Sequence, residues 1–176
     1  MKLVCVFVPN FSFHIEAQKR GYVKNKPTVI VKTIGSQQIV TGISPELNEN
    51  IVGNSLSQAL SKTGHAHVIQ SDDPQYKYQW NNILDHLRQK SPLVENAGLG
   101  IAYIGLKGMK SLYHGDAQFI TALERIIPPD FPVYFGIGES KFVAYLAALS
   151  ANNRGGFKAP LNDYKFIAKF PFKCCF

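Results

Sequence analysis

Cysteine is scarce in this 176-residue sequence, which holds only Cys5, Cys174 and Cys175. No two of them are spaced as a CxxC pair, and Cys174 and Cys175 are adjacent, too close for ordinary disulfide geometry. A disulfide framework and a zinc ribbon are therefore not supported, and a reducing cytoplasm fits. Cys5 lies in an apolar run, which predicts a buried thiol.

Long hydrophobic runs are also missing, since no stretch approaches the roughly 18 apolar residues that a membrane span needs. The apolar start of the chain is short, Pro9 and Asn10 interrupt it, and no small-residue cleavage site follows. We therefore expect a soluble, cytoplasmic protein with no membrane partner.

Acidic residues are few, with 12 Asp and Glu against 19 Lys and Arg, which gives a net charge of +7. A basic surface attracts polyanions such as nucleic acid, although a solvated surface without a partner explains the same charge. Apolar residues make up 45% of the chain and charged residues 18%, which is an ordinary globular balance.

Hydrophobic periodicity predicts alternating strands and helices along the chain. We expect strands at 3–8, 27–31, 38–43, 65–69, 94–106 (as two segments), 133–137 and 157–161. We expect helices at 11–20, 55–62, 75–89, 116–127 and 140–151. When residues 17–75 are set aside, this order describes an α+β sheet domain with helices on one face.

Three groups of residues have a functional and a structural interpretation. His65 and His67 alternate on an expected strand, but no third metal ligand is evident, which favours a surface position. Asp72 and Asp73 precede Pro74, a pattern typical of a helix start rather than of a metal pair. The glycines of 136–138 are too few to indicate a phosphate loop.

Five segments share their order and spacing with motifs of one protein family. They are Phe11-Ile15-Glu16, Pro27–Val31, Gly53-Leu56-Ala59, Ser91–Gly105 and Gly136–Gly138 with Lys141, Ala144 and Ala147. In this order they resemble the palm and fingers of Y-family (UmuC/DinB-like) DNA polymerases. Gly98-Leu99-Gly100 followed by Ala102-Tyr103 is most similar to the ImuB branch, whose members are mutagenesis proteins without catalytic acids.

The resemblance implies a polymerase-type palm, an α+β domain with a mixed or antiparallel sheet and helices on one face. A small α/β fingers subdomain is expected as an insertion. The palm would comprise residues 1–16 and 76–165 and the fingers residues 17–75. Residues 166–176 would begin a missing thumb or form a C-terminal tail.

The resemblance also locates the positions where these polymerases hold two cations with carboxylates. They correspond to Phe7, Gly100 and Ile101, none of which offers a side-chain oxygen. The aromatic residue under the incoming sugar corresponds to Ser12, and a late palm lysine to Asn152. We therefore expect no metal, no cofactor, no nucleotide site and no enzyme activity.

The expected function is that of a non-catalytic, Y-family polymerase-like accessory or scaffold in DNA repair, translesion synthesis or damage-induced (SOS) mutagenesis. Lys141, Arg154 and Lys158 are candidate DNA contacts, in weak and non-specific binding that would associate the protein with the nucleoid. Another polymerase or a repair protein is the expected partner. Two alternatives stay open: an active nucleotidyltransferase with relocated carboxylates, and a protein-interaction domain unrelated to DNA.

Overall fold

A computed structural model describes residues 2–154, 157–160 and 163–168 of the chain. Cys174, Cys175 and most of the 166–176 segment lie outside these residues. The chain forms two compact units, Met1–Pro9 with Trp80–Phe176, and Asn10–Gln79. One of the two boundaries, between Gln79 and Trp80, falls within a helix, α3 (Asp73–Arg88).

The first unit is built on a five-stranded mixed sheet with the order β5-β6-β1-β7-β8. Its strands are β1 (Leu3–Phe7), β5 (Val94–Gly98), β6 (Ile101–Gly105), β7 (Tyr134–Gly138) and β8 (Phe157–Lys158). Neighbouring strands are antiparallel except β7 and β8, which are parallel. The apolar run at the start of the chain thus forms an inner strand, as its continuous hydrophobicity predicts.

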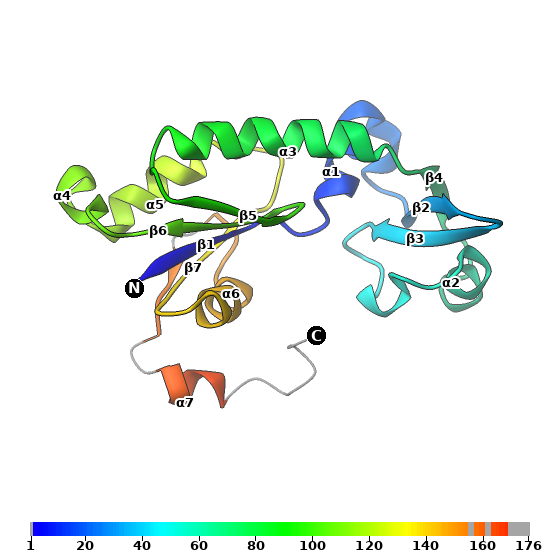
Figure 1. Cartoon of the computed structure of the whole chain (residues 1–176). Coiled ribbons are helices and arrows are strands. Elements are labelled where there is room, and N and C mark those ends of the chain that lie inside the picture. The colour runs from blue at the N-terminus through cyan, green and yellow to red at the C-terminus, as the bar shows by residue number, and fades with distance from the viewer. Residues whose placement is uncertain (1, 155–156, 161–162, 169–176) are drawn as a thin grey trace. The chain divides into compact units, whose positions relative to one another are not determined.

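Helices flank this sheet on both sides (Figure 1). The helices of the unit are α4 (Met109–Tyr113), α5 (Asp116–Glu124), α6 (Lys141–Leu149), α7 (Asp163–Ile167) and the later part of α3 (Asp73–Arg88). The later part of α3 and α5 lie on one side, and α6 lies on the other (Figure 1). Trp80 of α3 is buried, and its Nε1 donates to Oδ1 of Asn96 on β5 at 3.0 Å.

Two glycines let α6 approach the sheet closely. A Cβ on Gly136 would lie against the backbone of Ala144 and Ala148, and a Cβ on Gly138 would lie 2.6 Å from the nitrogen of Ala144. Because glycine carries no side chain, the helix backbone can rest directly on β7.

The second unit contains a three-stranded sheet with the order β3-β2-β4. Its strands are β2 (Thr28–Ile34), β3 (Gln37–Ile43) and β4 (His67–Gln70). Its helices are α1 (Phe11–Lys19), α2 (Leu56–Thr63) and the start of α3. Two short 3-10 turns span Gly21–Val23 and Glu49–Ile51. β2 and β3 form an antiparallel hairpin, and β4 pairs with β2 in parallel. Ser55 and Gln58 form a capping box at the start of α2, which fixes where this helix begins.

The α+β fold class is confirmed, but helices cover both faces of the first sheet (Figure 1) rather than the one face that was expected, because the glycines of β7 let α6 dock on the second face. The expected strands and helices occur within a few residues of their predicted bounds. α4 was not predicted, because its five residues are too short to show a helical period. Within the described residues, no helix is both long and apolar enough to cross a membrane.

Candidate DNA-binding face of the first unit

Strand register determines which side chains share the α6 side of the sheet. Phe7 is opposite Ile101 on β6 and opposite Tyr134 on β7, and Cys5 is opposite Tyr103 and Gly136. Since alternate residues of a strand point to the same face, these side chains and that of Leu3 line one surface. Glu95 of β5, opposite Tyr103, joins them. The structure therefore places Phe7 beside Ile101, and Gly100 lies next to Ile101, so the three positions expected to correspond to metal ligands lie together.

Phe7 belongs to a group of four half-buried rings, which we call the aromatic face: Phe7, Tyr103, Tyr134 and Tyr145. The Phe7 ring packs edge-on against Tyr145 of α6, with centroids 5.5 Å apart, and lies 6.2 Å from Tyr134. All four rings pack against a small buried cluster that contains Cys5. Burial raises the pKa of the Cys5 thiol to about 12.

Gly100 completes the turn between β5 and β6. It has a φ of 80°, a conformation that favours glycine, and its carbonyl accepts from Val8 N at 2.7 Å. Phe7 and Ile101 offer only hydrocarbon. Because magnesium requires oxygen ligands, these three residues do not fit a divalent cation. In the described parts of the chain, no group of three or more His, Cys, Asp or Glu could hold a metal ion.

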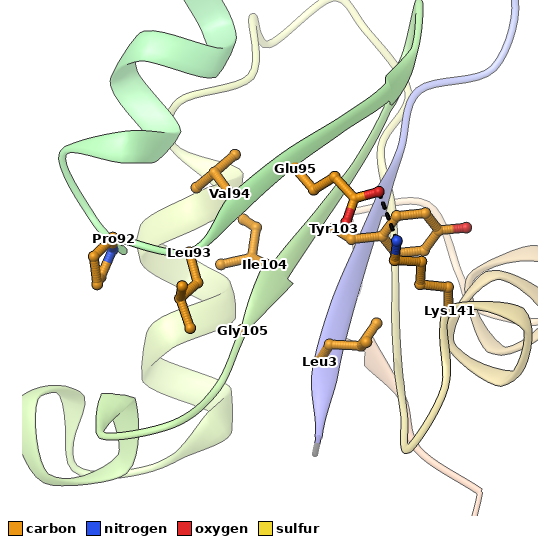
Figure 2. A pocket seen from close by; sticks show the side chains of 9 residues that line it. All are labelled: Leu3, Pro92, Leu93, Val94, Glu95, Tyr103, Ile104, Gly105 and Lys141. Carbon is orange, nitrogen blue, oxygen red and sulfur yellow. Dashed lines mark hydrogen bonds and ion pairs between the residues drawn. The ribbon is translucent and has the colours of Figure 1, made fainter.

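A groove of about 300 Å³ continues this surface toward the β5 edge (Figure 2). Its walls are mostly apolar, with Leu3, Leu93 and the Tyr103 ring facing the space (Figure 2). At one end, Lys141 Nζ donates to Oε1 of Glu95 at 2.6 Å and lies 5.9 Å from the centre of the Tyr103 ring. The groove thus combines an aromatic surface, a cation and a carboxylate.

The Tyr103 hydroxyl stays protonated at neutral pH. Burial, with smaller contributions from Cys5, Tyr145 and Glu95, raises its pKa to about 12. The side chain therefore offers an uncharged ring and a hydroxyl that can donate a hydrogen bond.

Comparison with known families shows which family the chain belongs to. The sequence model of the impB/mucB/samB family matches residues 6–149. The chain belongs to this family. The expected relation to UmuC/DinB-type, Y-family polymerases is thereby confirmed at the level of the family, whereas the finer likeness to the ImuB branch is not.

One relative and one solved structure that resemble this impB/mucB/samB chain carry the name DNA polymerase. DNA polymerase IV of Dehalococcoides mccartyi is 24% identical over 157 residues, which cover 87% of this chain and 40% of the relative. The crystal structure of DinB from Sulfolobus solfataricus superposes with a TM-score of 0.75 at 20% identity, over 91% of this chain and 48% of that one. An insertion ternary complex of Dbh DNA polymerase gives a TM-score of 0.75 at 17% identity, with the same coverage.

These matches correct one expectation. The sequence led us to expect that the chain is not an enzyme. The comparisons contradict this expectation, because the curated relative and Dbh are both DNA polymerases by name. The expectation rested on single positions, whereas the family match extends over most of the chain. The chain spans less than half the length of these relatives.

The two positions expected to be degenerate nucleotide contacts lie in different units. Ser12, on α1 of the second unit, has its hydroxyl beside Gly42 of β3. Asn152 is exposed and follows α6 in the first unit. The side-chain Oδ1 of the next residue, Asn153, accepts from Val133 N at 2.9 Å, which anchors this segment to the start of β7.

The three candidate DNA contacts lie in very different surroundings. Lys141 begins α6 and pairs with Glu95, and Lys158 is exposed on β8. Arg154 instead donates from Nε to the Phe131 carbonyl at 3.0 Å, and from Nη2 to the Ile127 and Pro128 carbonyls. Its side chain is only 25% exposed, so the guanidinium is engaged with the chain's own backbone.

The acidic pair of the second unit has a structural role at the start of α3. Asp72 Oδ1 accepts from Gln75 N at 3.3 Å, the hydrogen bond expected of a helix cap. Ion pairs join Asp72 to Lys19 and Asp73 to Lys32. A hydrogen bond from Lys19 lowers the pKa of Asp72, and one from Lys32 lowers that of Asp73.

Sequence reasoning missed Glu95, Tyr134 and Tyr145 as members of this face. The three residues lie on β5, β7 and α6, and only strand pairing and helix docking bring them together. One signal was present in the sequence: Tyr134 precedes the glycines of β7, and Tyr145 lies within the alanine-rich α6.

Proposed function

We propose that this chain is the palm and fingers part of a Y-family DNA polymerase protein that acts in DNA repair or damage-induced mutagenesis. The observation that carries the proposal is the impB/mucB/samB match over residues 6–149, supported by the fold shared with DinB and Dbh. In this proposal the palm, expected at residues 1–16 and 76–165, corresponds to the first unit, and the fingers, expected at 17–75, correspond to the second unit, although the units divide after Pro9 and after Gln79.

We further propose how the chain takes part in DNA synthesis. Phe7, Gly100 and Ile101 supply no metal ligand, which favours a role beside another polymerase, as an accessory or scaffold. Gly98-Leu99-Gly100 before Ala102-Tyr103 favours the ImuB-like mutagenesis proteins within the family. A cytoplasmic, nucleoid-associated location follows from this role and is part of the proposal.

DNA binding tests the proposal directly. The net charge of +7 and exposed cations such as Lys141 and Lys158 attract phosphates, but no described helix presents an obvious set of base-reading side chains. We expect weak, sequence-independent binding. If about three phosphates are neutralised, raising salt from about 50 to 200 mM should lower duplex affinity about 40-fold.

Fluorescence anisotropy with primed and duplex oligonucleotides over a salt series measures this slope. Two oligonucleotides of scrambled sequence serve as the control for sequence preference. No binding at low salt would remove the DNA role and favour a protein-interaction domain. Tight binding that persists at moderate salt, or a clear sequence preference, would contradict the proposed binding mode.

A second candidate is a nucleotidyltransferase whose carboxylates lie elsewhere. Glu95 favours it, because its carboxylate lies on the same face as Phe7, although a two-metal centre needs further ligands. If this second candidate is right, the protein should extend a primer with magnesium or manganese, and Glu95→Gln should abolish the extension. Template-dependent extension that Glu95→Gln leaves intact would exclude Glu95 as the relocated ligand.

A further inference from the structure

The rings of the aromatic face are partly accessible rather than fully enclosed in a core. Its rings come from four elements, β1, β6, β7 and α6, and each ring is half-buried, so it is held by packing while part of it stays accessible. Aromatic rings held in this way bind nucleobases by stacking, and every base has a face that can stack.

The groove beside Tyr103 adds space and charge. Its volume of about 300 Å³ is at the lower end of the range for small-ligand pockets. Lys141 Nζ lies over the Tyr103 ring, at the groove's end (Figure 2). A base that stacks on this face of the ring would take the place of the Lys141 ammonium, which would remain close enough to contact the nucleotide's phosphate.

We propose that the aromatic face and its groove bind unpaired bases of single-stranded DNA, with Lys141 contacting a phosphate. This rests on the proposed DNA role and names the form of DNA recognised. Bases in a duplex are already stacked on their neighbours, so only unpaired ones can use the rings. The positive net charge of the chain matches a polyanionic strand.

Glu95 weakens the binding of a phosphate to Lys141 at this site. The Lys141–Glu95 ion pair is exposed, with 52% and 55% of the two side chains accessible, and exposed pairs are weak. A phosphate can therefore compete with Glu95 for Lys141. Removing the carboxylate's charge should strengthen binding, which is a gain that damaged folding would not produce.

The test compares fluorescent single-stranded and duplex oligonucleotides of equal length at low salt. Tyr103→Leu and Tyr145→Leu should each lower single-strand affinity about 5-fold or more and leave duplex affinity unchanged. Tyr103→Phe should retain binding, and Glu95→Gln should raise it about 2-fold or more. Tyr78→Leu, at a tyrosine of α3 that is 60% exposed, is the matched control and should have no effect.

The outcomes separate this inference from the function on which it rests. If the parent protein binds neither form of DNA, the proposed function fails. If it binds DNA but Tyr103→Leu, Tyr145→Leu and Glu95→Gln bind single strands as the parent does, stacking is wrong and the DNA role stands. An apolar peptide that binds the parent and not Tyr103→Leu, while single-strand binding is unchanged, would assign the groove to a protein partner instead.

Discussion

Gly136→Ala should destabilise the first unit by about 3 kcal/mol or more. The new methyl group would lie against the backbone of Ala144 and Ala148 and 2.7 Å from the carbonyl carbon of Ala147. Backbone atoms of a helix cannot move aside as a flexible side chain can, so α6 would have to shift as a whole. Since Trp80 is the single tryptophan and lies in this unit, its fluorescence during urea unfolding measures the loss.

Gly105→Ala is the matched control. It lies on the same sheet, and an added Cβ there would meet the Leu93 side chain at 2.9 Å rather than backbone. Leu93 is partly exposed and can rotate away, so we expect a change of less than about 1 kcal/mol. Equal effects of the two substitutions would show that α6 does not rest on β7 as closely as described.

Arg154→Ala should destabilise the same unit by about 2–4 kcal/mol, because three backbone carbonyls lose a charged donor. These carbonyls belong to Ile127, Pro128 and Phe131, in the segment between α5 and β7. Arg154→Lys should recover little, because an ammonium cannot reproduce the planar fork of the guanidinium. Urea unfolding followed by Trp80 fluorescence again provides the measurement.

Lys158→Ala is the control for this prediction, since Lys158 is exposed and should contribute less than about 0.5 kcal/mol. The same two variants separate stability from DNA contact. If Arg154→Ala unfolds like the parent protein but loses DNA affinity, the structural role is wrong and Arg154 acts as a phosphate contact.

Much of the fold could be predicted because single segments encode it locally. The apolar run from Leu3 predicts an inner strand, the proline at 27 marks where β2 begins, and Asp72 before Pro74 marks where α3 begins. Each signal lies within a few residues of the element that it predicts. The family motifs add order and spacing, and the family match bears out the relationship.

The aromatic face and the Arg154 contacts could not be predicted, because they depend on distant segments. Tyr103 and Tyr145 are separated by 42 positions in sequence, and only register and helix docking place both beside β1. Arg154 adopts a left-handed conformation with φ 46°, and its side chain contacts carbonyls of residues that precede β7. The expectation that the chain is not an enzyme was also wrong. It relied on a few motif positions, whereas the family match extends over most of the chain.

The burial of Cys5 has a consequence for chemistry under oxidative stress, a condition that itself damages DNA. Because burial raises the pKa of Cys5 to about 12, very little of the thiol is ionised at neutral pH, and it is the thiolate that attacks peroxides and other electrophiles. Ala144 and Ala148 of α6 pack over the sulfur-bearing side chain. The first unit therefore keeps its inner thiol reduced for as long as α6 stays docked, and sulfenic acid at Cys5 would record that the helix had opened.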